Sequence, residues 1–99
     1  MSAVLKELGE TLKSLREKKQ LSQRDLAARI DMTQSHLSNI ENGQVNFSAK
    51  SLFQITRALE HELMFIPRQE IPTIKAILAA KEKPEHERPS PAYTPDEEN

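Results

Sequence analysis

Cysteine is absent from this 99-residue sequence, and glycine occurs only twice. Without cysteine the chain has neither a disulfide framework nor a thiolate metal site. The three histidines, His36, His61 and His86, are too scattered along the chain to indicate a metal cluster. No glycine-rich phosphate loop is present, and no nucleophile is paired with a base. We therefore expect a protein that is not an enzyme and that needs no metal or other cofactor.

Long hydrophobic runs are also missing. No stretch of about 18 apolar residues could span a bilayer, and the N-terminus lacks the basic-then-apolar pattern of a secretory signal. Hydrophobic residues make up 36% of the chain, which is enough for one compact core. These features predict a soluble intracellular protein with a single folded core and no membrane partner.

The formal net charge is only −1, but the charge is unevenly distributed. Residues 1–80 hold eleven lysines and arginines against nine acidic residues, whereas residues 81–99 hold three against six. A mildly basic domain followed by an acidic tail is compatible with nucleic-acid binding, because one basic face suffices to contact phosphates. The position of the charges therefore matters more than their sum.

Apolar residues recur at three- and four-residue steps in four segments, which predicts four helices. Ser22 and Thr33 can cap the second and third helices, with a tight turn at Asp31-Met32 between them, and Gly43 can end the third. The second helix should span about 22–30 and the fourth about 48–59. The apolar faces, in chain order, are Val4, Leu5, Leu8, Leu12 and Leu15; Leu26, Ala27 and Ile30; Leu37 and Ile40; Leu52, Phe53, Ile55, Thr56 and Leu59.

The pattern changes after the fourth helix. A short apolar run next to Pro67 predicts a strand rather than a helix. Because a lone strand leaves its backbone groups unpaired, we expect it to pair with the same strand of a second copy in a homodimer. From Pro72 a further short helix should cover this dimer seam with Ile74, Ile77 and Leu78, and a proline-rich, disordered tail should follow from residue 84. The predicted dimer strand consists of Leu63, Met64, Phe65 and Ile66.

Two stretches, LREKKQLSQRDLAARI and MTQSHLSNIENG, resemble the DNA-binding domain of the phage Cro and repressor (XRE) family over residues 12–59. The resemblance implies an all-α domain of four to five helices over residues 1–60, with a helix-turn-helix. Residues 61–83 would then form the dimerisation segment, and residues 84–99 the tail. Asp31 departs from the glycine that is usual at the turn, although aspartate tolerates a left-handed backbone better than most residues.

The third helix has an uncharged polar outer face, which suits readout of base edges in the major groove. Gln34 could bond to the N6 and N7 atoms of adenine, and the resemblance implies base-reading roles for Gln34, Ser35 and Asn39. The alternative is that these residues only keep an exposed helix soluble. The outward residues of this face are Gln34, Ser35, Ser38, Asn39 and Asn42.

Contacts to the DNA backbone are expected on both sides of this helix. The N-terminus of the second helix favours an anion, and the resemblance implies that Gln23 braces the phosphate backbone there. His36 lies at the edge of the face, where packing is as plausible as a phosphate contact, and the other surface residues could simply be solvated. The remaining candidates for backbone contacts are Thr33, Arg24, Asn42 and Lys50. The resemblance further implies a buried, structural ion pair between Arg16 and Glu41.

The segment HELMFIPR after the domain resembles the Hip-type antitoxins, whose dimers pair one such strand from each subunit. This resemblance implies a homodimeric repressor that binds operator DNA in the bacterial cytoplasm, associated with the nucleoid, and also binds a HipA-like kinase toxin. An autonomous phage-type or metabolic repressor without a toxin partner is the close alternative. A protein-interaction adaptor that has lost its DNA face is a second alternative, which a salt titration of DNA binding would distinguish.

Overall fold

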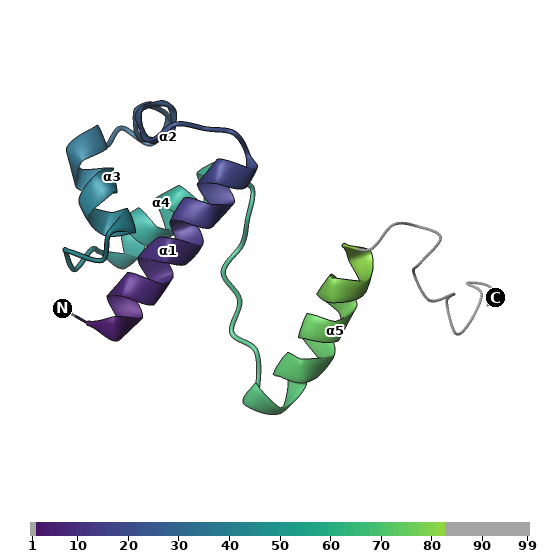
Figure 1. Ribbon diagram of the computed structural model, residues 1–99. Coiled ribbons are helices and arrows are strands. Elements are labelled where there is room, and N and C mark those ends of the chain that lie inside the picture. Colours follow the sequence, from purple (N-terminus) through teal and green to yellow (C-terminus); the bar gives the residue numbers. More distant parts are fainter. Residues whose placement is uncertain (1, 83–99) are drawn as a thin grey trace. The chain divides into compact units, whose positions relative to one another are not determined.

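The computed structural model describes residues 2–82. The chain divides into two compact units, Met1–Met64 and Phe65–Asn99. Helices α1 to α4 form the first unit, and α5 belongs to the second (Figure 1). The predicted disordered tail over residues 84–99, like His86, lies outside the described residues. Among the residues described, no helix is both long and apolar enough to cross a membrane.

Two of the four helices of the first unit begin at the hydroxyl caps that the sequence predicted, Ser22 and Thr33. Ser22 accepts a hydrogen bond from the backbone N–H of Asp25 and forms a full capping box with the Asp25 side chain. Thr33 caps α3 and Ser48 caps α4 in the same way, and each such bond satisfies an otherwise unpaired amide. The helices are α1 (Ala3–Lys18), α2 (Gln23–Arg29), α3 (Gln34–Glu41) and α4 (Ala49–Ala58).

A residue with positive φ follows each of these helices and reverses the chain. Gly43 after α3 has a φ of 71°, which glycine adopts without strain. The other three helices use non-glycine residues instead. Asp31 in the turn between α2 and α3 has a φ of 56°, as its place in the family motif predicts, and Gln20 and Glu60 each have a φ of 61°. The first unit therefore stores modest backbone strain at three helix ends.

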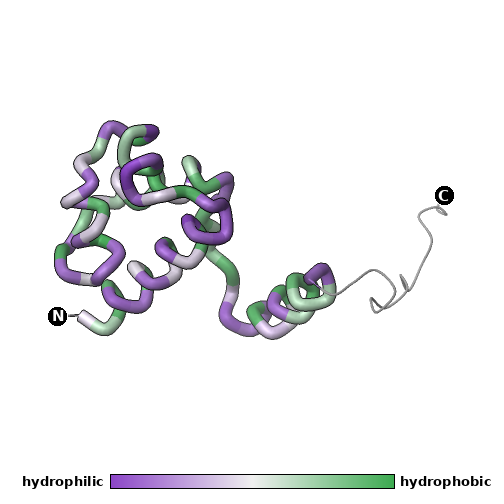
Figure 2. The backbone as a smooth tube through the Cα atoms, turned by 45° about the horizontal axis from the view of Figure 1, so that its top comes forward, coloured by the Kyte–Doolittle hydropathy of each residue, from purple (hydrophilic) through white to green (hydrophobic). Residues whose placement is uncertain are grey.

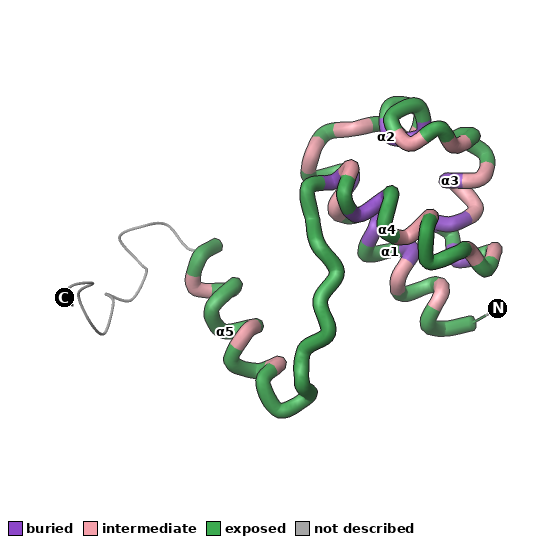
Figure 3. Tube along the Cα trace, turned by 180° about the vertical axis from the view of Figure 1, so that it is seen from behind, coloured by how far each residue is buried: buried purple, intermediate pink, exposed green. Residues whose placement is uncertain are grey.

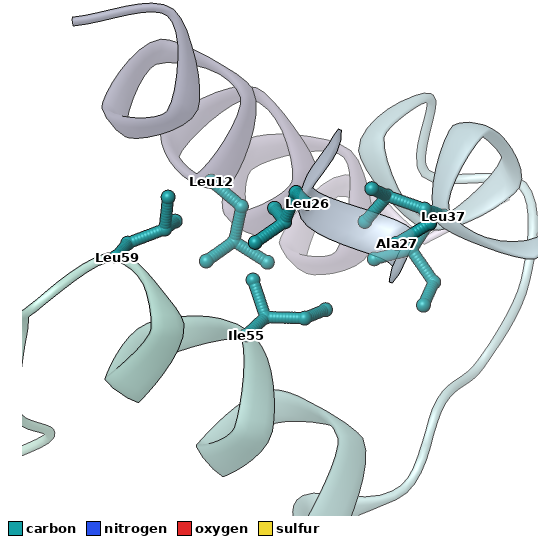
Figure 4. Close-up of a cluster of buried hydrophobic side chains, with 7 residues drawn as sticks. Leu12, Leu26, Ala27, Leu37, Ile55 and Leu59 are labelled. Carbon is teal, nitrogen blue, oxygen red and sulfur yellow. The ribbon is translucent and has the colours of Figure 1, made fainter. Parts of the chain in front are cut away.

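The predicted apolar faces meet in one core (Figure 4). Figure 3 shows the buried positions on α1 to α4. Seven hydrophobic residues are almost fully buried: Leu12, Leu26, Ala27, Leu37, Ile40, Ile55 and Leu59. All seven were predicted to face inward. Burial of each such side chain contributes about 1.5–3 kcal/mol relative to exposure, so this core holds the short helices together.

Two residues predicted to lie in the core are exposed. Val4 lies near the start of α1 and is 69% exposed. Phe53 is 43% exposed. Two residues along a helix correspond to a rotation of about 200°, so Phe53 lies on the face of α4 opposite to the buried Ile55. There the guanidinium of Arg57 lies 5.9 Å from the centre of the Phe53 ring. The inward prediction was therefore wrong for both Val4 and Phe53.

The predicted strand is absent, and residues 61–67 are irregular. A strand exists only with a neighbour that pairs its backbone groups, and no segment among residues 2–82 pairs with this one. The structure of the single chain therefore does not support the predicted strand. Its side chains lie open to solvent, with Met64 75% exposed and Phe65 completely so. The full set of four exposed residues is Leu63, Met64, Phe65 and Ile66.

The second unit contains a short 3-10 helix, η1 (Arg68–Glu70), followed by α5 (Ile71–Lys81). Pro72 lies in the first turn of α5, where its missing N–H costs nothing, so the predicted helix start is confirmed. Figure 2 colours much of α5 hydrophobic, yet no residue of α5 is buried, and Ile77 and Leu78 are about half exposed. The prediction that this helix covers a strand seam is likewise not supported, because residues 63–66 form no strand in the single chain.

Candidate nucleic-acid interface

Helix α3 presents a polar face opposite the side by which it packs. Leu37, Ile40 and Glu41 are buried, and α3 contacts both α1 and α2 through this side. Gln34, Ser35 and Asn42 are exposed, whereas Ser38 and Asn39 are partly buried at the margin of the same surface. These five residues are here called the α3 polar face. The structure thus brings together the residues that were predicted to read bases.

The chemistry of the α3 polar face suits hydrogen bonding to base edges. It carries amide and hydroxyl groups, which both donate and accept, and no carboxylate that would repel phosphates. The backbone N–H of His36 donates a hydrogen bond to the hydroxyl oxygen of Thr33 at 3.1 Å, which caps α3. Gln34 and Ser35 occupy the first two positions of the capped helix.

Three of the residues predicted to contact the DNA backbone line one open hollow of about 460 Å³. Thr33 and His36 come from the start of α3, and Lys50 comes from the start of α4. Ser51 and Gln54 also line the hollow; nothing in the sequence singled them out, because their positions depend on how α4 packs. Asp31 adds a carboxylate to the same wall, which opposes the attraction of Lys50 for an anion.

The other backbone candidates lie elsewhere on the first unit. Arg24 is exposed on α2, and Asn42 forms the C-cap at the far end of α3. Gln23 is partly buried, and its side-chain Nε2 donates a hydrogen bond to Oε1 of Glu41 at 2.9 Å. The resemblance implied a contact between Gln23 and a phosphate of the DNA, whereas in this structure the side-chain amide of Gln23 binds Glu41.

Arg16 and Glu41 form a buried ion pair between the ends of α1 and α3. Arg16 Nε lies 2.7 Å from Glu41 Oε2, and Arg16 Nη2 lies 3.0 Å from Glu41 Oε1. Arg16 Nη1 also donates to the carbonyl oxygen of Leu21 at 2.6 Å. Hydrogen bonding to Glu41 raises the pKa of Arg16 despite its burial. Because the guanidinium and the carboxylate form two hydrogen bonds in a bidentate geometry, the ion pair can exist with almost no solvent contact.

Both glycines lie where α1 and the end of α3 touch, which sequence reasoning did not predict. A Cβ on Gly9 would lie 2.5 Å from the carbonyl oxygen of Ile40 and 2.6 Å from that of Glu41. A Cβ on Gly43 would lie 2.6 Å from the Cα of Lys6. The available signal was a glycine in the interior of a predicted helix, since such a glycine usually has a packing reason.

The helix-turn-helix family model (HTH_3) matches residues 12–62, more than half of the chain. The chain therefore belongs to the helix-turn-helix family. It is 41% identical over 69 residues to the HTH-type transcriptional regulator y4dL of Sinorhizobium fredii, a match that covers 70% of this chain but only 35% of that regulator.

Two further comparisons support this assignment. The ImmF control region 10 kDa protein of Bacillus phage phi105 is 33% identical over 70 residues, covering 71% of this chain and 78% of the phage protein. The crystal structure of the restriction-modification controller protein C.AhdI from Aeromonas hydrophila superposes with a TM-score of 0.60 at 34% identity. That superposition covers 62% of this chain and 92% of the controller.

Proposed function

We propose that this protein is a sequence-specific DNA-binding transcriptional repressor that inserts α3 into the major groove. The observation that carries the proposal is the α3 polar face: a largely exposed helix surface with amides and hydroxyls but no charge, on a helix held by a buried ion pair and an N-cap hydrogen bond. An α-helix fits the width of the major groove, and such side chains can distinguish base pairs there.

Within this proposal Gln34, Ser35 and Asn39 read bases, with Ser38 at the edge. The Gln34 amide is exposed at the first position of α3, so it can reach the N6 and N7 atoms of an adenine with two hydrogen bonds. One good pair of this kind contributes about 1–3 kcal/mol of discrimination against the wrong base. Specificity is therefore expected to depend most on Gln34.

Backbone contacts come from two regions in the proposal. The hollow with Thr33, His36 and Lys50 receives the phosphates on one side of the recognition helix. Arg24 on α2 and Asn42 at the end of α3 serve the other contacts. Such contacts orient the protein on the duplex and make binding sensitive to salt, but carry no sequence information.

We also propose that the repressor acts as a homodimer through the segment after α4. The side chains of Met64 and Phe65 are more exposed than a soluble chain ordinarily leaves large apolar residues, and α5 has hydrophobic residues without a buried face. A second copy would bury these surfaces, and a dimer would read two half-sites about 34 Å apart. Sedimentation equilibrium of the wild type against a Phe65→Ser variant tests this association.

Two other functions remain as predictions. The antitoxin role includes binding of a HipA-like kinase, and its main structural argument is lost because residues 63–66 form no strand. The exposed apolar side chains of this segment still favour a protein partner. The similarity to a phage control-region protein favours the autonomous repressor instead. Co-purification of a HipA-like kinase with the chain would favour the antitoxin role over the autonomous one.

The test of DNA binding is a footprint of the purified protein on its own upstream region. We expect two protected half-sites about one helical turn apart, lost or relaxed in Gln34→Ala. Ser14→Ala is the control, because Ser14 is exposed on α1 and belongs to neither the proposed DNA surface nor the proposed dimer surface. A lack of protection at low salt would refute the proposal and favour the protein-interaction adaptor, since an adaptor does not bind DNA at any salt concentration.

A further inference from the structure

The Glu41 carboxylate joins three helices. Its Oε2 atom accepts a hydrogen bond from Arg16 Nε, and its Oε1 atom accepts two, from Arg16 Nη2 and from Gln23 Nε2. Arg16 comes from α1, Gln23 is the first residue of α2, and Glu41 is the last residue of α3. Glu41 is only 2% exposed, so these donors replace the water that a carboxylate normally binds.

The end of α3 is held on α1 independently of Gln23. The backbone of Gly9 lies against the carbonyl oxygens of Ile40 and Glu41, and Gly43 lies against the backbone of Lys6. Helix α2 is attached differently. Within residues 2–82, the bond from Gln23 to Glu41 is the one side-chain hydrogen bond between α2 and α3. Gln23 is therefore the residue of α2 whose side chain makes a polar contact with the end of α3.

We propose that Gln23 is a positioning residue of the DNA interface, which keeps its amide on Glu41 in the operator complex and thereby sets α3 relative to α2. The inference rests on the proposed DNA-binding function and adds to the phosphate contact that the resemblance implied. The side-chain amide of Gln23 has two N–H groups, so one can donate to Glu41 while the other is left for a phosphate. Losing the bond to Glu41 would leave a buried carboxylate one donor short, which is costly. Keeping the bond avoids this cost in both the free and the bound protein.

The first test uses Gln23→Met, which keeps the length of the side chain and removes the amide. We expect its affinity for operator DNA to fall about tenfold, which corresponds to about 1.4 kcal/mol. Its affinity for an unrelated duplex should hardly change, because that binding depends on charge rather than on helix placement. A variant that was merely less stable but still folded would keep the ratio of the two affinities. Arg24→Ala is the matched control, because a lost charge contact lowers both affinities and reduces the salt dependence.

The second measurement repeats the titration on operator duplexes that carry one uncharged methylphosphonate at a time. If Gln23 is a positioning residue, Gln23→Met binds more weakly than the wild type on every one of these duplexes. If Gln23 acts only through a phosphate contact, the variant and the wild type bind equally well to the duplex in which that one phosphate is uncharged. That outcome would overturn the inference without affecting the proposed DNA-binding function.

A charge swap gives an independent test. Gln23→Glu places two carboxylates together and should abolish specific binding, whereas the double variant Gln23→Glu with Glu41→Gln restores an amide-to-carboxylate bond beside Arg16. We expect the double variant to recover operator binding to within about tenfold of the wild type. A double variant that is as stable as the wild type to urea but binds no better than Gln23→Glu would overturn the inference. A wild-type protein without any footprint would instead refute the proposed function itself, and the inference with it.

Discussion

Replacing Gly9 with alanine should destabilise the protein, although alanine is the better helix former. In a helix interior the change from glycine to alanine contributes about 0.8–1.0 kcal/mol of stability by propensity alone. At Gly9, however, the new Cβ would lie 2.5 Å from the carbonyl oxygen of Ile40 and 2.6 Å from that of Glu41. Both are backbone atoms, which cannot rotate away as a flexible side chain would, so α1 and α3 must separate.

Overpacking of this kind costs about 1–3 kcal/mol, and more when backbone must move. The propensity gain offsets only part of this cost, so we expect a net loss of about 1–2 kcal/mol from Gly9→Ala. For a domain of this size each kcal/mol lowers the melting temperature by roughly 4–8 °C. Far-ultraviolet circular dichroism during thermal unfolding measures the change.

Ser14→Ala is the matched control, because Ser14 is an exposed position of the same helix and alanine meets no neighbour there. Its melting temperature should equal or slightly exceed that of the wild type. A Gly9→Ala protein as stable as Ser14→Ala would refute the reasoning, because it would mean that the backbones of α1 and α3 are not in close contact. Operator affinity should fall together with stability, since Glu41 and Gly43 hold the end of α3 at the same contact.

Three further predictions concern single side chains. Glu41→Ala leaves the buried Arg16 charge without its partner and should lower the free energy of unfolding by about 3–5 kcal/mol. An unchanged midpoint of urea unfolding would contradict this prediction. Asp31→Gly relieves a positive φ and should raise stability by about 1 kcal/mol in the same assay, whereas Asp31→Asn, which removes only the charge, should gain little. Hydrogen bonding from Lys19 lowers the pKa of the exposed Glu60 carboxyl. The small contribution of the Lys19–Glu60 pair to folding stability is therefore complete above the pKa of Glu60 in the unfolded chain, and it is lost as pH falls through the pKa in the folded protein. Glu60→Gln should lose this pH dependence of stability, and added salt should weaken it in the wild type.

The helices of this protein follow from local sequence. Apolar spacing predicts the face that each helix buries, and the hydroxyls of Ser22 and Thr33 predict where α2 and α3 begin. These features depend on neighbours a few residues away, so one sequence is enough to read them. The family motif adds the turn at Asp31 and the partnership of Arg16 with Glu41.

Contacts between distant segments were decided only by the tertiary structure. The sequence could not place the amide of Gln23 on Glu41, or the backbone of Gly9 on the end of α3, because each depends on how two helices cross. Phe53 looked like a core residue by hydrophobicity, but the rotation of α4 exposes it. Phe65 likewise lies in a run with the composition of a strand. A strand also requires a partner that donates and accepts hydrogen bonds, and composition does not supply one.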